Sequence, residues 1–155
     1  GYNERRLTVV FLIIRPMSMN RNPIRTRRKA FRVGPLPTDL INRALQTELE
    51  VADVWVSKAC HSHIADDHPD DYPVIMANLI DILRSPTYAG QDARHGGAFY
   101  LVKRVEPGVQ NRDFALVVIA LEVSQHGTYN VRTAYTIKQS AIDSRRLNGA
   151  LKVLF

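Results

Sequence analysis

The stretch Phe114-Ala-Leu-Val-Val-Ile-Ala-Leu121 is apolar at every position. A short continuous apolar run rich in β-branched residues favours a strand that is buried on both faces, and such a strand lies in the middle of a sheet. Two more strand-like segments flank this run, and Pro107-Gly108 and His126-Gly127 separate the three. The pattern therefore predicts three consecutive antiparallel strands over 98–105, 114–123 and 128–138, with 114–123 in the centre.

Before these strands the apolar period is helical. Thr38 precedes a three- and four-residue repeat that predicts a helix over 38–49, and residues 52–57 are typical of a short strand. Ser57 can cap a second helix that ends before Pro69, and Pro73 suits the first turn of a third helix that ends at Ser85-Pro86. A weaker helix is predicted over 140–147 and a closing strand over 151–155. Helices followed by antiparallel strands make this an α+β fold.

The positive charge of the chain is unevenly distributed. Its 155 residues carry a formal charge of +6, yet residues 1–32 contain nine Lys or Arg and one acid, a local charge of +8. Residues 33–155 contain twelve bases and fourteen acids, a charge of −2. We therefore expect a basic N-terminal arm or linker over 1–32 and one folded domain over 33–155. A phosphate-binding tether is the alternative role for the arm.

Two features limit the class of protein. The apolar run Leu7–Ile14 is too short to cross a bilayer, which takes about twenty residues, and we interpret it as a short strand. The lone Cys60 excludes an internal disulfide, a zinc finger and a CxxC redox site, so any metal would have to rely on His and carboxylates.

Three of the five histidines, His61, His63 and His68, fall within eight residues and lie beside Asp66 and Asp67. Histidine gives and takes protons near neutral pH, so such a cluster favours acid/base chemistry. On one continuous helix, however, His63 and His68 would point about 140° apart. They converge only if the helix ends between them. A solvated helix end and a His/Asp metal site are the two alternatives.

Other candidate residues lie in the predicted strands and in the loop at His95-Gly-Gly. Tyr100 and Lys103 belong to the strand over 98–105. In the strand over 128–138, alternation places Val131, Thr133 and Tyr135 on one face and Arg132, Ala134 and Thr136 on the other. Thr and Tyr favour sheets without any function, so the pattern alone does not distinguish a site from ordinary strand propensity.

The order of these motifs resembles the phage-type barnase/EndoU/colicin/RelE-like (BECR) nucleases. The motifs are His63-Ile64 with His68 five residues on, Leu83-Arg-Ser-Pro86, Tyr100-Leu-Val-Lys103 and Val131-Arg-Thr133-Ala-Tyr135, and the resemblance covers about residues 34–150. It implies a ribonuclease that needs no metal or cofactor, with N-terminal helices packed on a curved antiparallel β-sheet. Such domains are usually toxin modules at the C-terminus of phage or secreted proteins.

The resemblance implies that His63, His68, Lys103 and Thr133 are the catalytic residues. RNA cleavage without a metal needs a base for the 2′-hydroxyl, a cation or donor for the phosphorane and an acid for the 5′-oxygen. His63 is the candidate base and His68 the candidate acid or positioning group, and which histidine has which role stays open. The candidate substrate-binding residues are Arg132, which supplies a cation, and Tyr100 and Tyr135, which can stack on an unpaired base.

Three hypotheses about function follow. The first is the ribonuclease, the second is an inactive nucleic-acid- or protein-binding domain of the same fold, and the third is a His/Asp metalloenzyme. We expect RNA and an immunity or antitoxin protein as partners, and no membrane. Because the sequence begins with Gly1, we expect a piece of a longer protein, acting in the cytoplasm or delivered into the cytoplasm of a target cell.

Overall fold

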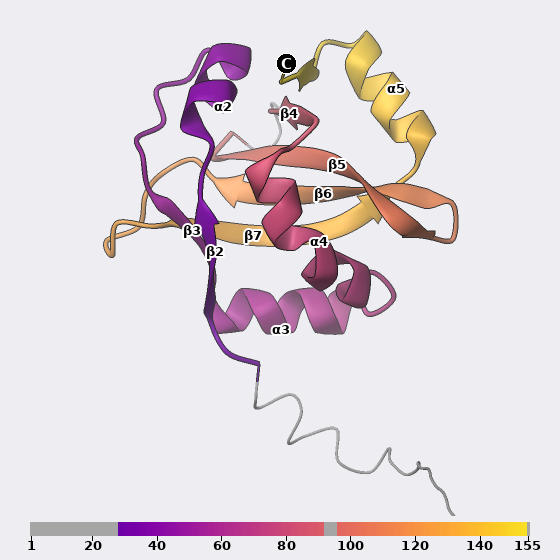
Figure 1. The fold of residues 1–155 in the computed structure, drawn as a ribbon, viewed down its shortest axis with the longest axis horizontal. Helices are drawn as coiled ribbons and strands as arrows, with labels where there is room; N and C mark the ends of the chain where they lie inside the picture. Colours follow the sequence, from indigo (N-terminus) through magenta and orange to yellow (C-terminus); the bar gives the residue numbers. More distant parts are fainter. Residues whose placement is uncertain (1–27, 92–95, 155) are drawn as a thin grey trace, which may run out of the picture.

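The computed structural model describes residues 28–91 and 96–154. The helices are α2 (Thr38–Leu45), α3 (Lys58–Asp67), α4 (Tyr72–Arg84) and α5 (Gln139–Leu147), and the strands are β2 (Phe31–Pro35), β3 (Asp53–Val56), β4 (Tyr88–Gly90), β5 (Ala98–Val109), β6 (Arg112–Ala120), β7 (Tyr129–Ile137) and β8 (Leu151–Val153). The strands form one sheet in the order β2-β3-β7-β6-β5-β4-β8 (Figure 1). All neighbouring pairs are antiparallel except β3 and β7, and the predicted α+β fold is confirmed.

Strand β6 lies at the centre of the sheet, between β5 and β7, as its apolar sequence predicts. Its side chains alternate between two hydrophobic clusters, with Ala115 and Val117 in the larger and Phe114 and Leu116 in the smaller. The strand is buried on both faces because helices pack on both sides of the sheet.

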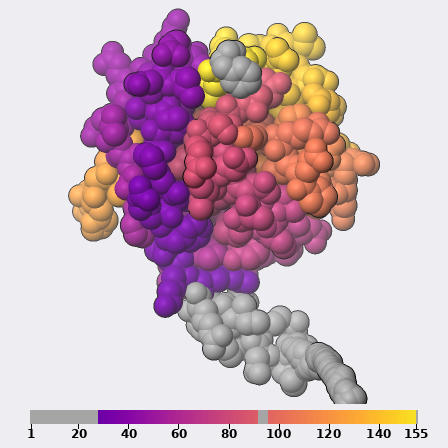
Figure 2. Space-filling model, viewed as in Figure 1, coloured from indigo at the N-terminus to yellow at the C-terminus, as the bar shows by residue number. Residues whose placement is uncertain are grey.

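The larger cluster lies between the sheet and helices α2, α3 and α4. Helix α4 packs across this face, because its buried residues recur at three- and four-residue intervals: Ile75, Leu79, Ile82 and Leu83. Viewed from this side, α4 lies over the middle of the sheet, and its side chains fill the space between the N-terminal strands and the β5–β6 hairpin (Figures 1 and 2). None of the described helices is long and apolar enough to cross a membrane.

The smaller cluster lies on the opposite face. There, Ile142 of α5 packs with Val102 and Leu116, together with Phe114 and Ile137. Helix α5 is short and covers one part of this face. The part between α5 and β7 is left open, and it forms the cavity described below.

Several predicted elements have different boundaries in the structure. The first helix ends at Leu45 instead of residue 49, because Gln46 takes a left-handed φ of 56° and the Asn42 side chain binds both the amide and the carbonyl of Leu49. Strand β5 continues through the expected break at Pro107-Gly108. The turn falls instead at Gln110-Asn111, whose φ angles of 50° and 70° suit a two-residue hairpin.

Strand β2 crosses the expected boundary between arm and domain. It begins at Phe31, which pairs with Val56 of β3, and the guanidinium of Arg32 donates to Asp53 at 2.7 Å. This hydrogen bond raises the pKa of Arg32 and lowers that of Asp53. Residues 31 and 32 thus belong to the sheet, whereas the rest of the predicted arm up to residue 27, with the strand expected over Leu7–Ile14, lies outside the described residues.

A β-bulge in β7 changes which side chains share a face. Thr133 pairs with Val118 but Val131 pairs with Ile119, so Arg132 is an extra residue without a partner on β6. Val131 consequently packs in the larger cluster, whereas Arg132 and Thr133 both line the cavity on the other face. The prediction that Val131 and Thr133 share a face, with Arg132 on the opposite one, is wrong because simple alternation takes no account of a bulge.

Asp71, in the turn between α3 and α4, is a buried carboxylate that joins this turn to the end of β7. It is 5 % exposed and accepts hydrogen bonds from the Thr136 amide at 2.9 Å, the Thr136 hydroxyl at 2.7 Å and Arg112 at 3.1 Å. Burial alone would raise the pKa of Asp71, but the hydrogen bonds from Thr136 and Arg112 outweigh it, and the pKa lies below its usual value. The charged carboxylate therefore stabilises the fold.

We expect Asp71→Asn to lower the free energy of unfolding at neutral pH by about 3 kcal/mol, because it removes a buried charge partner of Arg112. Since the folded pKa of Asp71 is depressed, its contribution is present above the unfolded pKa and is lost as the pH falls through the folded value. The difference between wild type and variant should thus shrink below about pH 4. Urea unfolding at several pH values measures both effects, with the exposed neighbour Asp70→Asn as the control. An equal loss in both variants would contradict this role.

Candidate functional site

Helix α3 carries the histidine cluster, and it ends between the two candidate catalytic residues. Ser57 caps its start by accepting from the Cys60 amide at 3.1 Å, as the sequence predicts. The last helical residue is Asp67, and His68 has non-helical angles, φ −128° and ψ 58°. The rings of His63 and His68 consequently converge, with centroids 5.8 Å apart. The helix thus ends between the two histidines, as it must if they are to share one site.

His63 is held between a carboxylate and a hydroxyl. Its Nδ1 lies 2.6 Å from Oδ2 of Asp67, one helical turn later, and its Nε2 lies 3.1 Å from Oγ1 of Thr133 on β7. Because an ionised carboxylate can only accept, Nδ1 carries a hydrogen, and in the neutral ring Nε2 accepts from the Thr133 hydroxyl. The arrangement leaves a proton-accepting nitrogen, oriented by Asp67, at the open face of the sheet.

His68 lies against the next residue of the same strand face. Its ring stacks on Tyr135 with the centroids 5.5 Å apart and the planes 27° from parallel. Two residues of β7, Thr133 and Tyr135, thus each contact one histidine. Neither histidine lines the cavity described next, but each contacts one residue that does, Thr133 or Tyr135.

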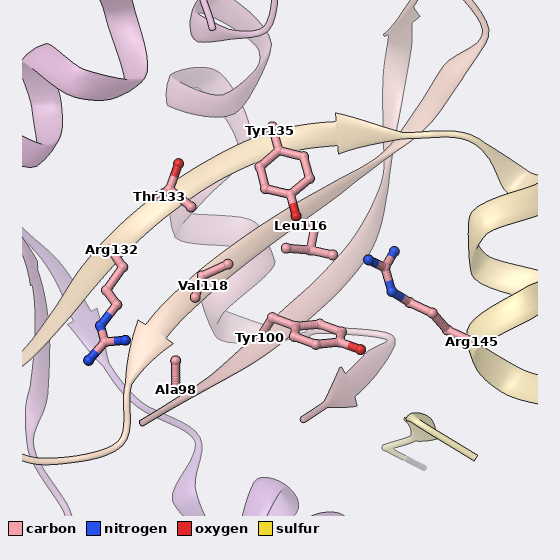
Figure 3. A pocket seen from close by; sticks show the side chains of 8 residues that line it. All are labelled: Ala98, Tyr100, Leu116, Val118, Arg132, Thr133, Tyr135 and Arg145. Carbon is pink, nitrogen blue, oxygen red and sulfur yellow. The ribbon is translucent and has the colours of Figure 1, made fainter. Parts of the chain in front are cut away.

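A cavity of about 290 Å³ opens beside this pair on the face of the sheet that α5 leaves uncovered. Its lining comes from four elements and consists of Ala98, Tyr100, Leu116, Val118, Arg132, Thr133, Tyr135 and Arg145. Figure 3 shows Arg132 and Arg145 at opposite ends of the cavity, with the Tyr135 ring between them pointing into it. The cavity is therefore apolar along its floor and positively charged at both ends.

Tyr100 lies on the floor of the cavity, and its ring is packed in place. Arg145 of α5 lies over this ring, 5.5 Å from its centroid. The ring also lies close to the backbone of Gly90, where an added Cβ would come 2.6 Å from two of the ring carbons. Glycine at position 90 is thus required for the close approach of the Tyr100 ring.

Lys103 does not lie with the histidines. On β5 it shares a face with Leu101, toward α4, where its ammonium group donates to Ser85 at 2.6 Å and pairs with Asp81 at 3.1 Å. The expected grouping of Lys103 with His63, His68 and Thr133 is therefore not found. Among the described residues, the cations that line the cavity on the open face are Arg132 and Arg145.

The other two reactive groups of the cluster point elsewhere. His61 binds the Lys29 carbonyl through Nδ1 at 2.9 Å and the Tyr72 hydroxyl through Nε2 at 2.6 Å, so it joins α3 to the chain that enters β2. Burial raises the pKa of the Cys60 thiol to about 11, which keeps it protonated and unreactive at neutral pH. The loop at His95 lies outside the described residues, although Gly96 and Gly97 are described.

Within residues 28–91 and 96–154, no three side chains of His, Cys, Asp or Glu are grouped so that they could hold a metal ion. The described residues thus offer no ligand set for the His/Asp metal site that the sequence left open.

The structure adds two residues to those that the sequence predicted. Asp67 is four residues after His63, and this helical spacing could have identified it as the partner of the imidazole. Arg145 lies in the weakly amphipathic α5, and nothing in the local sequence indicates that it reaches Tyr100.

Comparison with known proteins gives one result. No curated protein and no solved structure matches the chain. A family model described as "phage-Barnase-EndoU-ColicinE5/D-RelE like nuclease3" matches residues 32–144. This region runs from Arg32, the second residue of β2, through β7 into α5, and it contains both histidines with Thr133 and Tyr135. The protein belongs to this family of nucleases.

Proposed function

We propose that the protein is a metal-independent endoribonuclease that cleaves RNA by attack of a 2′-hydroxyl on the adjacent phosphate. The proposal is supported above all by one observation, the position of His63 between Asp67 and Thr133 with His68 5.8 Å away. A base with an oriented lone pair and a second imidazole nearby can serve as the base and the acid of this reaction.

His63 is the proposed base. Asp67 holds the proton on Nδ1, so Nε2 is free to take the proton of the substrate 2′-hydroxyl. The 2′-oxygen then bonds to phosphorus, and the bond from phosphorus to the 5′-oxygen breaks. His68 in its protonated form gives a proton to that leaving oxygen. The products are a 2′,3′-cyclic phosphate and a 5′-hydroxyl, and the two histidines end with their protonation states exchanged.

Thr133 and Arg132 are proposed to hold the phosphate. The 2′-hydroxyl replaces Thr133 as the donor to His63, which frees the Thr133 hydroxyl to donate to a non-bridging oxygen. The bulge brings Arg132 onto the same face, where its guanidinium lies over Gly97, since an added Cβ there would come within 3.3 Å of Nη2. Figure 3 shows the guanidinium directed away from the Thr133 hydroxyl, so a change of the Arg132 rotamer is needed for both residues to stabilise the charge that builds up on phosphorus.

RNA, rather than DNA, is the proposed substrate because the reaction uses the 2′-hydroxyl as its nucleophile. Tyr100 and Tyr135 in the cavity are proposed to contact an unpaired base, as aromatic residues do in proteins that bind single strands. We further propose that the domain acts as a toxin from a phage or mobile element, in the cytoplasm of a target cell, and that an immunity or antitoxin protein binds it. A nuclease that needs no metal would otherwise damage the cell that makes it.

We expect the protein to cleave single-stranded RNA in the presence of EDTA and to leave 2′,3′-cyclic phosphate ends. An oligonucleotide with a single 2′-deoxynucleotide on the 5′ side of the cut should resist cleavage at that position only. Mass spectrometry of the products identifies both features. Activity that returns only when a divalent metal is restored would support the metalloenzyme instead, and binding without cleavage would support the inactive binding domain.

We expect His63→Ala and His68→Ala each to slow RNA cleavage by about two to four orders of magnitude, the usual effect of removing a positioned acid or base. The pH dependence of the rate should be bell-shaped in the wild type and lose one limb in each variant. The matched control is His126→Ala, because His126 is exposed in the β6–β7 turn. If His61→Ala abolished activity in a folded protein while His63→Ala did not, the assignment would be wrong.

Asp67→Asn should slow cleavage by at least about tenfold, because an amide can donate to Nδ1 and so turn the wrong nitrogen of His63 toward the substrate. Asp66→Asn is the control, since Asp66 pairs with Arg28. Nitrogen-15 NMR of the histidine rings should show the hydrogen of neutral His63 on Nδ1 in the wild type. In Asp67→Asn it should show this hydrogen shared between Nδ1 and Nε2. An unchanged tautomer with lower activity would mean that Asp67 acts only on the fold.

A further inference from the structure

We propose that the cavity bounded by Arg132 and Arg145 binds the unpaired base next to the cut and selects guanine. This inference rests on the proposed function, because it uses the same site. It goes further in assigning one base and one specificity residue, Arg145, which the sequence motifs did not identify.

The shape of the cavity requires an unpaired base. Its floor consists of Tyr100, a residue only 6 % exposed, with Leu116 and Val118, and the ring of Tyr135 forms a wall. A base that enters such a recess has to leave the stack of a helix first, because paired bases present only their edges in the grooves. Single-stranded RNA is thus the form that fits.

The distance between the cavity and the histidines indicates where the phosphate and the base of one nucleotide would lie. Thr133 on β7, Val118 on β6 and Tyr100 on β5 are cross-strand neighbours. Two strand spacings separate Thr133 from Tyr100 by about 10 Å, roughly the reach of one nucleotide from its phosphate to the far edge of its base. With the phosphate at Thr133, beside the histidines, the base reaches Tyr100 and Arg145.

The chemistry of the lining favours an edge that carries hydrogen-bond acceptors. Among the described residues that line the cavity, the charged ones are two guanidinium groups, and a guanidinium can only donate. Guanine presents two adjacent acceptors, O6 and N7, which arginine binds with two parallel hydrogen bonds. Adenine presents N7 beside the donor N6, which would meet a second donor.

Arg145 is oriented for this contact before any ligand binds. Its guanidinium lies over the Tyr100 ring, which restricts the rotation of a long side chain. Figure 3 shows it extending from α5 toward the cavity, opposite Arg132. The next residue, Arg146, stacks at the same distance of 5.5 Å on Tyr88, and it does not line the cavity. Arg145 and Arg146 are thus a matched pair for a test.

The test measures the binding of nucleoside 3′-monophosphates by NMR titration, with guanosine, adenosine, inosine and 7-deazaguanosine as the bases. Guanosine should bind about ten- to a hundredfold more tightly than adenosine. Inosine keeps O6 and N7 and should bind like guanosine, whereas 7-deazaguanosine lacks N7 and should lose most of the preference. Arg145→Leu should bring the ratio of guanosine to adenosine affinity close to one, and Arg146→Leu should leave it unchanged.

Cleavage of single-stranded RNAs that contain one guanosine should occur next to that base, and pairing the guanosine in a duplex should suppress the cut. Equal binding of guanosine and adenosine, no binding of either, or a preference that survives Arg145→Leu in folded protein would overturn the inference. Selective binding of guanosine without any RNA cleavage would leave the base site standing and contradict the proposed ribonuclease. RNA cleavage without base selectivity would support the proposed ribonuclease and overturn the guanine site.

Discussion

The carboxylate of Asp71 accepts three hydrogen bonds in a buried position and so fixes the turn that follows α3. This turn determines where His68 lies. The amides of Asp71 and Tyr72 both bind the carbonyl of His68, so the backbone of the histidine is tied to the same point as the carboxylate. Because the carboxylate binds Thr136 of β7, His68 is held against Tyr135, the neighbouring residue of that strand. A stability element of the fold thereby also sets the spacing of the proposed acid and base.

The two faces of the sheet differ in how far helices cover them, and this difference separates the core from the candidate site. Helices α2, α3 and α4 cover one face and form most of the core, and the short α5 covers part of the other. The uncovered part carries the cavity, and the bulge in β7 adds Arg132 to it beside Thr133. The proposed phosphate site and the proposed base site thus lie on a rigid sheet, while the histidines approach from the helix at its edge. Such a division suits catalysis, because the sheet positions the substrate and needs no rearrangement.

Much of the fold follows from local patterns. The apolar run from Phe114 predicts the central strand because burial on both faces leaves no polar position, and Ser57 predicts the start of α3 through a cap that the structure contains. Strand β4 was not predicted, since three residues are too few to show a period. The parallel pairing of β3 with β7 depends on contacts between residues far apart in the chain, which no local pattern encodes.

The candidate site was predictable where it depends on short-range spacing. His63, His68 and Thr133, which the motifs single out as candidates, lie together in the structure. The sequence does not show that Lys103 lies apart from these residues. Strand alternation predicts which side chains share a face, but it does not predict which face of the sheet α4 covers. The sequence does not indicate a role for Arg145, because its contact with Tyr100 joins residues 45 positions apart. That contact depends on how α5 packs on the sheet.

The most direct test of the proposed acid/base pair is a kinetic measurement on an RNA whose leaving 5′-oxygen at the cut is replaced by sulfur. A thiolate leaves without a proton, since a thiol has a pKa of about 8.5, so only the general acid becomes dispensable. If His68 is the acid and His63 the base, His68→Ala should cleave this substrate at nearly the wild-type rate, whereas His63→Ala should stay slower by at least about a hundredfold. Equal impairment of both variants on both substrates would contradict the account.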